Sequence, residues 1–163
     1  MRSRAAALAV LLLSLLPWIS RAAEPPTPPL TLEALRIDPA NPGPDTLCHL
    51  AVTVRNAGTR RASALVFRVR IGGREMPVYA KEVFLPVIEP GATAEIRLHN
   101  FWTTETGRPV PPNGRLEIEV ALVEARWLDV RKQDGAEVRV LGDPVAGLPS
   151  PRSTRSATVP FRR

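Results

Sequence analysis

Apolar side chains recur at every second position in four separate stretches of this sequence. In chain order, the apolar members are Cys48, Leu50, Val52 and Val54; Leu65, Phe67, Val69 and Ile71; Ile96 and Leu98; and Leu116, Ile118, Val120 and Leu122. A period of two places successive side chains on opposite faces of a β-strand. Each stretch is therefore predicted to be a strand with one buried face and one exposed face.

Weaker alternation adds further strands, and turn residues separate them. The additional apolar positions are Leu35 and Ile37; Val83, Leu85 and Val87; and Val138 and Val140. Proline, glycine and asparagine fill the breaks, and a sustained helical period is absent from the sequence after its first two dozen residues. About seven short strands without intervening helices predict an all-β fold, an immunoglobulin-like antiparallel β-sandwich over residues 32–141.

The N-terminus has the pattern of a signal peptide. Arg2 and Arg4 precede an apolar run, and Ser20-Arg21-Ala22 offers small residues at the two positions that define cleavage. The run is too short to cross a bilayer as a helix, and no cysteine at the cleavage point would accept a lipid anchor. We therefore expect residues 1–22 to be removed, residues 23–31 to form a proline-rich tether, and a product without a transmembrane segment in the periplasm or outside the cell.

Charge argues against one class of partner. The predicted signal peptide holds three of the 22 basic residues and no acidic one, so the formal charge falls from +6 to +3 in the mature chain. Four arginines lie in residues 142–163, which contain no acidic residue after Asp143. We interpret this segment as a basic, disordered tail with a possible weak attraction to an anionic surface. The remaining body is near neutral, so nucleic acid is not expected as a partner.

Several motifs resemble a known family. Leu35-Arg36-Ile37 leads to Pro39 and Pro42, the stretch from Leu50 to Asn56-Ala57-Gly58 closes a strand, and Ile88-Glu89-Pro90-Gly91 precedes the next one. Over residues 32–124 the chain resembles the bacterial cell-adhesion-related domain (CARDB) and its Ig-like relatives. The resemblance implies a non-catalytic adhesion or interaction module of the envelope.

Chemistry-bearing motifs are scarce. The sequence contains no G-x-S-x-G, H-E-x-x-H or phosphate-binding glycine loop, so we expect neither an enzyme nor a cofactor. Potential soft metal ligands are Cys48, His49, Met76 and His99. Alternation places Cys48 and His49 on opposite faces of one strand, which argues against a shared metal site.

The segment from Asn100 to Asn113 is the best candidate for partner contact. Phe101 and Trp102 end a predicted strand, and Arg108 follows in a loop that contains three prolines. Loops at the ends of a sandwich commonly carry recognition, and exposed aromatic side chains favour contacts with proteins or sugars. The alternative is that one or both aromatics cap the core, because alternation places Trp102 in register with Ile96 and Leu98.

These observations predict an exported, non-catalytic Ig-like module that binds an envelope protein or glycan, or acts as a scaffold. One alternative is a small periplasmic carrier of a metal or other ligand. A second alternative is a structural accessory of an envelope complex. A carrier would retain a small molecule on native purification, whereas an accessory would co-purify with protein.

Overall fold

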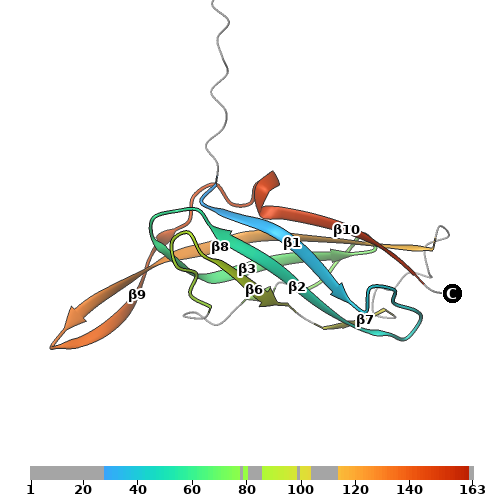
Figure 1. The fold of residues 1–163 in the computed structure, drawn as a ribbon, viewed down its shortest axis with the longest axis horizontal. Coiled ribbons are helices and arrows are strands. Elements are labelled where there is room, and N and C mark those ends of the chain that lie inside the picture. The colour runs from blue at the N-terminus through green and yellow to red at the C-terminus, as the bar shows by residue number, and fades with distance from the viewer. Residues whose placement is uncertain (1–27, 78, 81–85, 99, 104–113, 162–163) are drawn as a thin grey trace, which may run out of the picture.

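The computed structural model describes residues 28–77, 79–80, 86–98, 100–103 and 114–161, which form two antiparallel β-sheets (Figure 1). Buried side chains from both sheets meet in one apolar core. The predicted all-β, immunoglobulin-like sandwich is confirmed. The predicted signal peptide lies outside the described residues, and none of the described helices is long and apolar enough to cross a membrane.

The first sheet has four strands in the order β1–β2–β6, and β7 also pairs with β2. Their bounds are β1 (Leu30–Asp38), β2 (Leu47–Asn56), β6 (Thr93–Arg97) and β7 (Phe101–Trp102). β2 is therefore the central strand, with β1 along one edge and β6 followed by β7 along the other.

The second sheet has six strands and is organised around one long strand. Their bounds are β3 (Arg61–Ile71), β4 (Arg74–Glu75), β5 (Tyr79–Ala80), β8 (Arg115–Gln133), β9 (Ala136–Pro144) and β10 (Thr154–Pro160). β8 pairs with β3 along one edge, and with β10 and then β9 along the other. A short 3-10 helix, η2 (Pro151–Ser153), precedes β10.

The strong alternating stretches face the core as predicted. Every one of their apolar members is buried, from Cys48 on β2 to Leu122 on β8. The polar neighbours Glu117 and His49 are exposed on the outer faces. Beyond Leu122 the buried positions of β8 become Ala125 and Leu128, because the pairing with β3 is irregular beside Val66.

A buried asparagine ties the two sheets together where the Asn-Ala-Gly motif ends β2. The Asn56 side chain donates to the carbonyl oxygens of Arg60 (2.7 Å) and Ile88 (2.9 Å), and its Oδ1 accepts from the Gly58 amide at 3.0 Å. A Cβ on Gly58 would lie 3.0 Å from the Trp127 ring and 3.1 Å from Asn56 Oδ1. The motif therefore needs asparagine for its three hydrogen bonds and glycine for space.

The C-terminal segment corrects one prediction. Residues 142–161 of the predicted disordered tail are ordered, because β10 pairs with β8 from Thr154 opposite Ala121 to Pro160 opposite Arg115. Val145 and Ser153 are buried. The sequence signal is weak because β10 begins with Thr154, Arg155 and Ser156. Its pairing with β8 and the partial packing of Val159 and Phe161 against the core hold it in place. Weak attraction to an anionic surface stays a prediction, now for arginines on and beside a paired strand.

Three boundaries also differ from the prediction. The domain begins at Leu30, inside the predicted tether, because Leu30 and Leu32 are fully buried on β1. Val87 lies outside any strand, and Val83 and Leu85 lie outside the described residues. Val138 is 36% exposed on β9, because this strand extends away from the core (Figure 1).

Candidate functional site

β6 and β7 both pair with β2, but the segment that joins them contains one more residue than the part of β2 that it faces. Arg97 lies opposite Ala51, and Phe101 lies opposite Cys48. Between these pairs β2 advances by three residues, whereas the opposing segment advances by four. An extra residue in one strand of a pair is a β-bulge, and a shift of one residue moves every later side chain to the other face of the sheet.

The bulge places Phe101 inside the sandwich and Trp102 on its surface. Phe101 is 2% exposed, whereas Trp102 is 45% exposed. The alternative, in which Trp102 shares the inner face with Ile96 and Leu98, is therefore wrong for Trp102. The prediction that Phe101 contacts a partner is also wrong, because Phe101 is buried. Phe101 fills the core position instead, which leaves Trp102 as the aromatic residue of this pair that a partner can reach.

Trp102 belongs to a small outer face of the first sheet. Leu47 is its cross-strand neighbour, and His49 and Asn100, which flank the next pair of Cys48 and Phe101, are both exposed. Nδ1 of His49 and Oδ1 of Asn100 are 2.9 Å apart and form a hydrogen bond. We call Leu47, His49, Asn100 and Trp102 the Trp102 face. It combines an aromatic ring with neighbouring polar groups that can donate and accept hydrogen bonds.

A hydrogen-bonded clip holds the backbone beneath this face. The backbone amides of Thr46 and Thr103 donate to Thr103 Oγ1 (3.1 Å) and to the Thr46 carbonyl (3.0 Å), respectively. Thr103 is buried, and its hydroxyl donates to the Gly43 carbonyl at 2.9 Å. The clip thus fixes one side of the Leu47 and Trp102 pair, and the paired Cys48 and Phe101 lie on the other side. No sequence pattern indicated these threonines, because their spacing of 57 residues becomes a contact only through the sheet.

Among the other predicted site residues that the structure describes, only His49 belongs to the Trp102 face. Arg108 lies outside the described residues. Cys48 is fully buried and His49 is exposed, so the two adjacent residues lie on opposite faces as alternation predicted. Met76 packs partly against the core, and His99 is not described. Within the described segments no three His, Cys, Asp or Glu side chains gather in a way that could hold a metal ion.

Burial controls the chemistry of the single thiol. Desolvation, with a smaller contribution from the nearby Asp38 carboxylate, raises the pKa of Cys48 to about 11. The thiol is therefore protonated at neutral pH and has little nucleophilic character. Cys48 acts as a small apolar core residue.

An apolar cavity of about 190 Å³ lies between the sheets near Phe101. Its lining among the described residues includes Leu50 on β2, Val69 and Ile71 on β3, and Met76. An apolar cavity of about 150 Å³ in another protein stays dry and admits benzene, so this space suits a small apolar molecule. The sequence did not indicate it, because its walls are ordinary core side chains.

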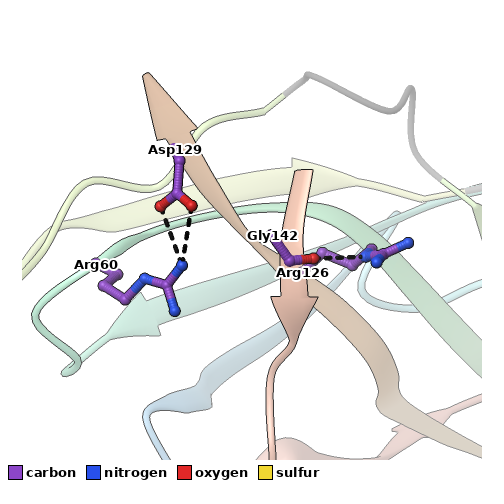
Figure 2. Close-up of polar contacts among 4 residues, drawn as sticks. All are labelled: Arg60, Arg126, Asp129 and Gly142. Carbon is purple, nitrogen blue, oxygen red and sulfur yellow. Dashed lines mark hydrogen bonds and ion pairs between the residues drawn. The ribbon is translucent and has the colours of Figure 1, made fainter. Parts of the chain in front are cut away.

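At the opposite end of the sandwich, polar contacts fix the base of the β8–β9 hairpin (Figure 2). Arg60 Nη2 donates to both carboxylate oxygens of Asp129, at 3.0 and 3.2 Å. The Arg60 guanidinium also lies over the Trp127 ring, 5.6 Å from its centroid. Arg126 Nε donates to the Gly142 carbonyl at 3.0 Å, which joins β8 to β9. A Cβ on Gly142 would lie 3.0 Å from Arg60 Nη2.

Comparison with known proteins gives structural neighbours only. No family model matches the sequence, and no curated protein matches it. The solved structures that are similar to this chain include CARDB domains. The family that the sequence resembles is thus also present among the structural neighbours.

Three of these structures illustrate the range of structural similarity, sequence identity and coverage. A CARDB domain from Pyrococcus furiosus, solved in complex with di-metal ions, has a TM-score of 0.46 and 18% identity and covers 83% of this chain and 89% of its own. A cell surface protein domain from Methanosarcina acetivorans has a TM-score of 0.48 and 14% identity, with 82% and 92% covered. An alkylpurine DNA glycosylase from Pseudomonas fluorescens, bound to DNA containing an abasic site analog, has a TM-score of 0.44 and 16% identity, with 84% and 31% covered.

Proposed function

We propose that this protein is an exported, non-catalytic binding module that holds an envelope protein or glycan through the Trp102 face. The observation that carries the proposal is the outward position of Trp102, which the bulge between β6 and β7 produces. The signal-peptide pattern of residues 1–22 supports export, since such segments direct proteins out of the cytoplasm.

The setting of Trp102 suits recognition. Phe101, which precedes Trp102, is anchored in the core, and the clip formed by Thr46 and Thr103 fixes the backbone that follows Trp102. A ring held in this way loses little conformational entropy when a partner covers it, which favours affinity. Tryptophan is also among the residues that contribute most to binding energy at protein interfaces.

Two polar residues beside Trp102 can orient a bound partner through hydrogen bonds. The hydrogen-bonded pair of His49 and Asn100 lies beside the ring on the same face, so a partner that covers Trp102 also meets these two groups. A sugar presents an apolar ring face edged by hydroxyl groups, and a protein surface offers a similar mixture of apolar and polar groups. Both partner classes therefore fit the Trp102 face.

Affinity capture tests the proposal. The mature chain is immobilised and exposed to envelope extract, beside a Trp102→Ala variant and a Glu117→Ala control, which changes an exposed residue on the other sheet. We expect the control to capture the partner as the wild type does, and Trp102→Ala to lose at least tenfold in retained material while its circular dichroism spectrum is unchanged. Equal capture by all three chains would contradict the proposal.

Two treatments of the extract distinguish the partner classes. Protease digestion before capture removes a protein partner and leaves a glycan, whereas periodate oxidation destroys a glycan and spares the fold of most proteins. The bound fraction then reports which class contacts Trp102.

The apolar cavity beside Phe101 favours a second candidate function, a carrier of a small apolar molecule. Native mass spectrometry of the purified mature chain would show a bound species, and Leu50→Phe would fill the cavity and prevent its retention. A wild-type chain that carries no small molecule after native purification from its own envelope would contradict this function.

A further inference from the structure

The tip of the β8–β9 hairpin extends beyond the rest of the second sheet (Figure 1). The pairing of β3 with β8 ends with Arg61 opposite Leu128, whereas β8 and β9 remain paired up to Gln133 opposite Ala136. We call residues 129–140 the arm. Asp134 and Gly135 close it with φ of 52° and 81°, the positive values that a tight hairpin turn requires.

The outer edge of the arm is open. Among the described residues β9 pairs only with β8, so one row of its backbone amides and carbonyls faces away from the sheet. Natural proteins usually protect such an edge with proline, a bulge, charged side chains or a covering segment. From Ala136 to Leu141 β9 contains no proline, all six positions pair regularly with β8, and its two charged residues, Glu137 and Arg139, are of opposite sign.

The sequence of this edge is complementary to itself. Val138 lies between Glu137 and Arg139, with Ala136 and Val140 on either side. Glu137 and Arg139 are exposed, and neither forms an ion pair within the described part of the chain. In an antiparallel pair centred on Val138, each Glu137 would lie opposite an Arg139.

We propose that β9 pairs antiparallel with β9 of a second copy of this chain, in the register centred on Val138. The interface then has one apolar face, formed by Ala136, Val138 and Val140 from each copy. Its other face has two pairs of opposite charge, each joining Glu137 of one copy to Arg139 of the other. The open backbone edges hydrogen-bond across the twofold axis, which extends the second sheet from one copy to the next.

Side-chain pairing selects this register. A centre at Arg139 would place two arginines opposite each other, and a centre at Glu137 would place two glutamates opposite each other. Directly opposed like charges destabilise a strand pair, whereas opposed unlike charges stabilise it. A shift of one residue would bring Val138 opposite a charged side chain. The register centred on Val138 is the one that matches charge with charge and apolar with apolar residues.

The proposed pairing has a consequence for binding by the Trp102 face, although it does not depend on that function. β7 and β9 lie at opposite ends of the long axis of the molecule (Figure 1). Pairing through the arms would leave both Trp102 faces at the distal ends of the dimer, available for bivalent attachment. A contact limited to one strand pair is small, so we expect a weak, concentration-dependent dimer.

Charge reversal tests the pairing. In sedimentation equilibrium of the mature chain, we expect Glu137→Arg alone and Arg139→Glu alone each to weaken the dimer at least tenfold, because each creates two pairs of like charge. An equimolar mixture of the two variants should dimerise again, and the double variant should dimerise as the wild type does. Unchanged circular dichroism spectra control for folding.

Cross-linking tests the register. Val138→Cys places two thiols opposite each other across the twofold axis, whereas the matched control Arg131→Cys places them on β8, one strand further away on each side. The native Cys48 is buried and does not interfere. We expect mild oxidation to convert the Val138→Cys variant into a covalent dimer much faster than the control. A wild-type chain that is monomeric at millimolar concentration, a dimer that both charge reversals leave intact, or equal cross-linking of the two cysteine variants would overturn the proposal.

Discussion

The two exposed large apolar side chains of the described structure lie at opposite ends of the molecule and reach solvent for different reasons. Trp102, at 45% exposure, lies on the outer face of a sheet whose inner face packs on the core, because one inserted residue turns it outward while Phe101 turns inward. Val138, at 36% exposure, belongs to the arm, which extends past the end of the sandwich. The first is a rigid platform on a packed domain, and the second is on a ribbon held by its own two strands.

The difference shows what alternation in a sequence can indicate. Alternating apolar residues predict a strand, but they predict burial only where a second sheet covers one face. On β8, Ile118 has that cover, whereas Val130 near the tip is only partly buried. The same strand is therefore core in one half and surface in the other.

We expect the largest difference in the free energy of unfolding between a variant in the covered part of β8 and a variant in the arm. We expect Ile118→Ala to lower the free energy of unfolding by about 2–5 kcal/mol, because it leaves a cavity in a closed core. Val138→Ala and Glu117→Ala should each change it by less than about 0.5 kcal/mol. Denaturant titration of the three variants at a concentration where the chain is monomeric measures this. A loss at Val138 equal to that at Ile118 would show that the arm is part of the core.

We expect the second-largest loss of stability at the buried Asn56, because it supports the closed end of the sandwich near the base of the arm. Asn56→Ala removes the hydrogen bonds to the Arg60 and Ile88 carbonyls and to the Gly58 amide, of which the Ile88 carbonyl keeps its bond from the Ala62 amide. We expect a loss of about 3 kcal/mol. Thermal and denaturant unfolding would measure it, with the exposed Arg55→Ala as a neighbouring control. A loss below about 1 kcal/mol would mean that water replaces these hydrogen bonds.

Alkaline pH provides a third test of the closed interior. The pKa of Cys48 is raised to about 11 in the folded chain from 9.0, so the unfolded chain releases this proton first. The stability contributed by the neutral thiol is fully present below pH 9 and is lost as the pH rises toward 11. The full difference corresponds to about 2–3 kcal/mol.

The matched variant Cys48→Ala isolates this effect from other groups that titrate in the same range. Its unfolding free energy should fall less steeply between pH 9 and 11 than that of the wild type. Parallel pH profiles for the two chains would contradict a buried, neutral thiol.

The smallest effect concerns the attachment of the arm. Arg60 and Asp129 are partly exposed, and a surface ion pair of this kind contributes about 0–1 kcal/mol. Arg60→Ala should therefore leave global stability almost unchanged while it speeds amide hydrogen exchange in residues 129–140. Exchange that rises equally in β2 and in the arm would show that the contact supports the whole fold.

The strong strands were predictable because their signal is local. Leu50, Phe67 and Ile118 each sit in a stretch where every second residue is apolar, and such a stretch fits a half-buried strand almost irrespective of context. The strand β10 was harder to predict, because Thr154 and Ser156 occupy its first half and its apolar alternation is limited to Ala157, Val159 and Phe161. Only Val159 and Phe161 pack partly against the core.

The candidate site was predicted in part. The sequence indicated Phe101 and Trp102 as a pair, but alternation assigned Trp102 to the inner face. A bulge depends on how the segment pairs with β2. The sequence of one strand does not show how many residues of its partner lie opposite to it. The contact of His49 with Asn100 follows from the same pairing. Local spacing in the sequence therefore predicted neither the bulge nor this contact.

The most direct test of the account compares the two adjacent aromatic residues. The free energies of unfolding of Phe101→Ala and Trp102→Ala are measured by denaturant titration, and the folded variants are compared for partner capture. We predict that Phe101→Ala loses about 3–5 kcal/mol of stability, whereas Trp102→Ala loses less than about 1 kcal/mol and also loses capture. Greater destabilisation by Trp102→Ala than by Phe101→Ala would contradict the account, because it would place the tryptophan in the core.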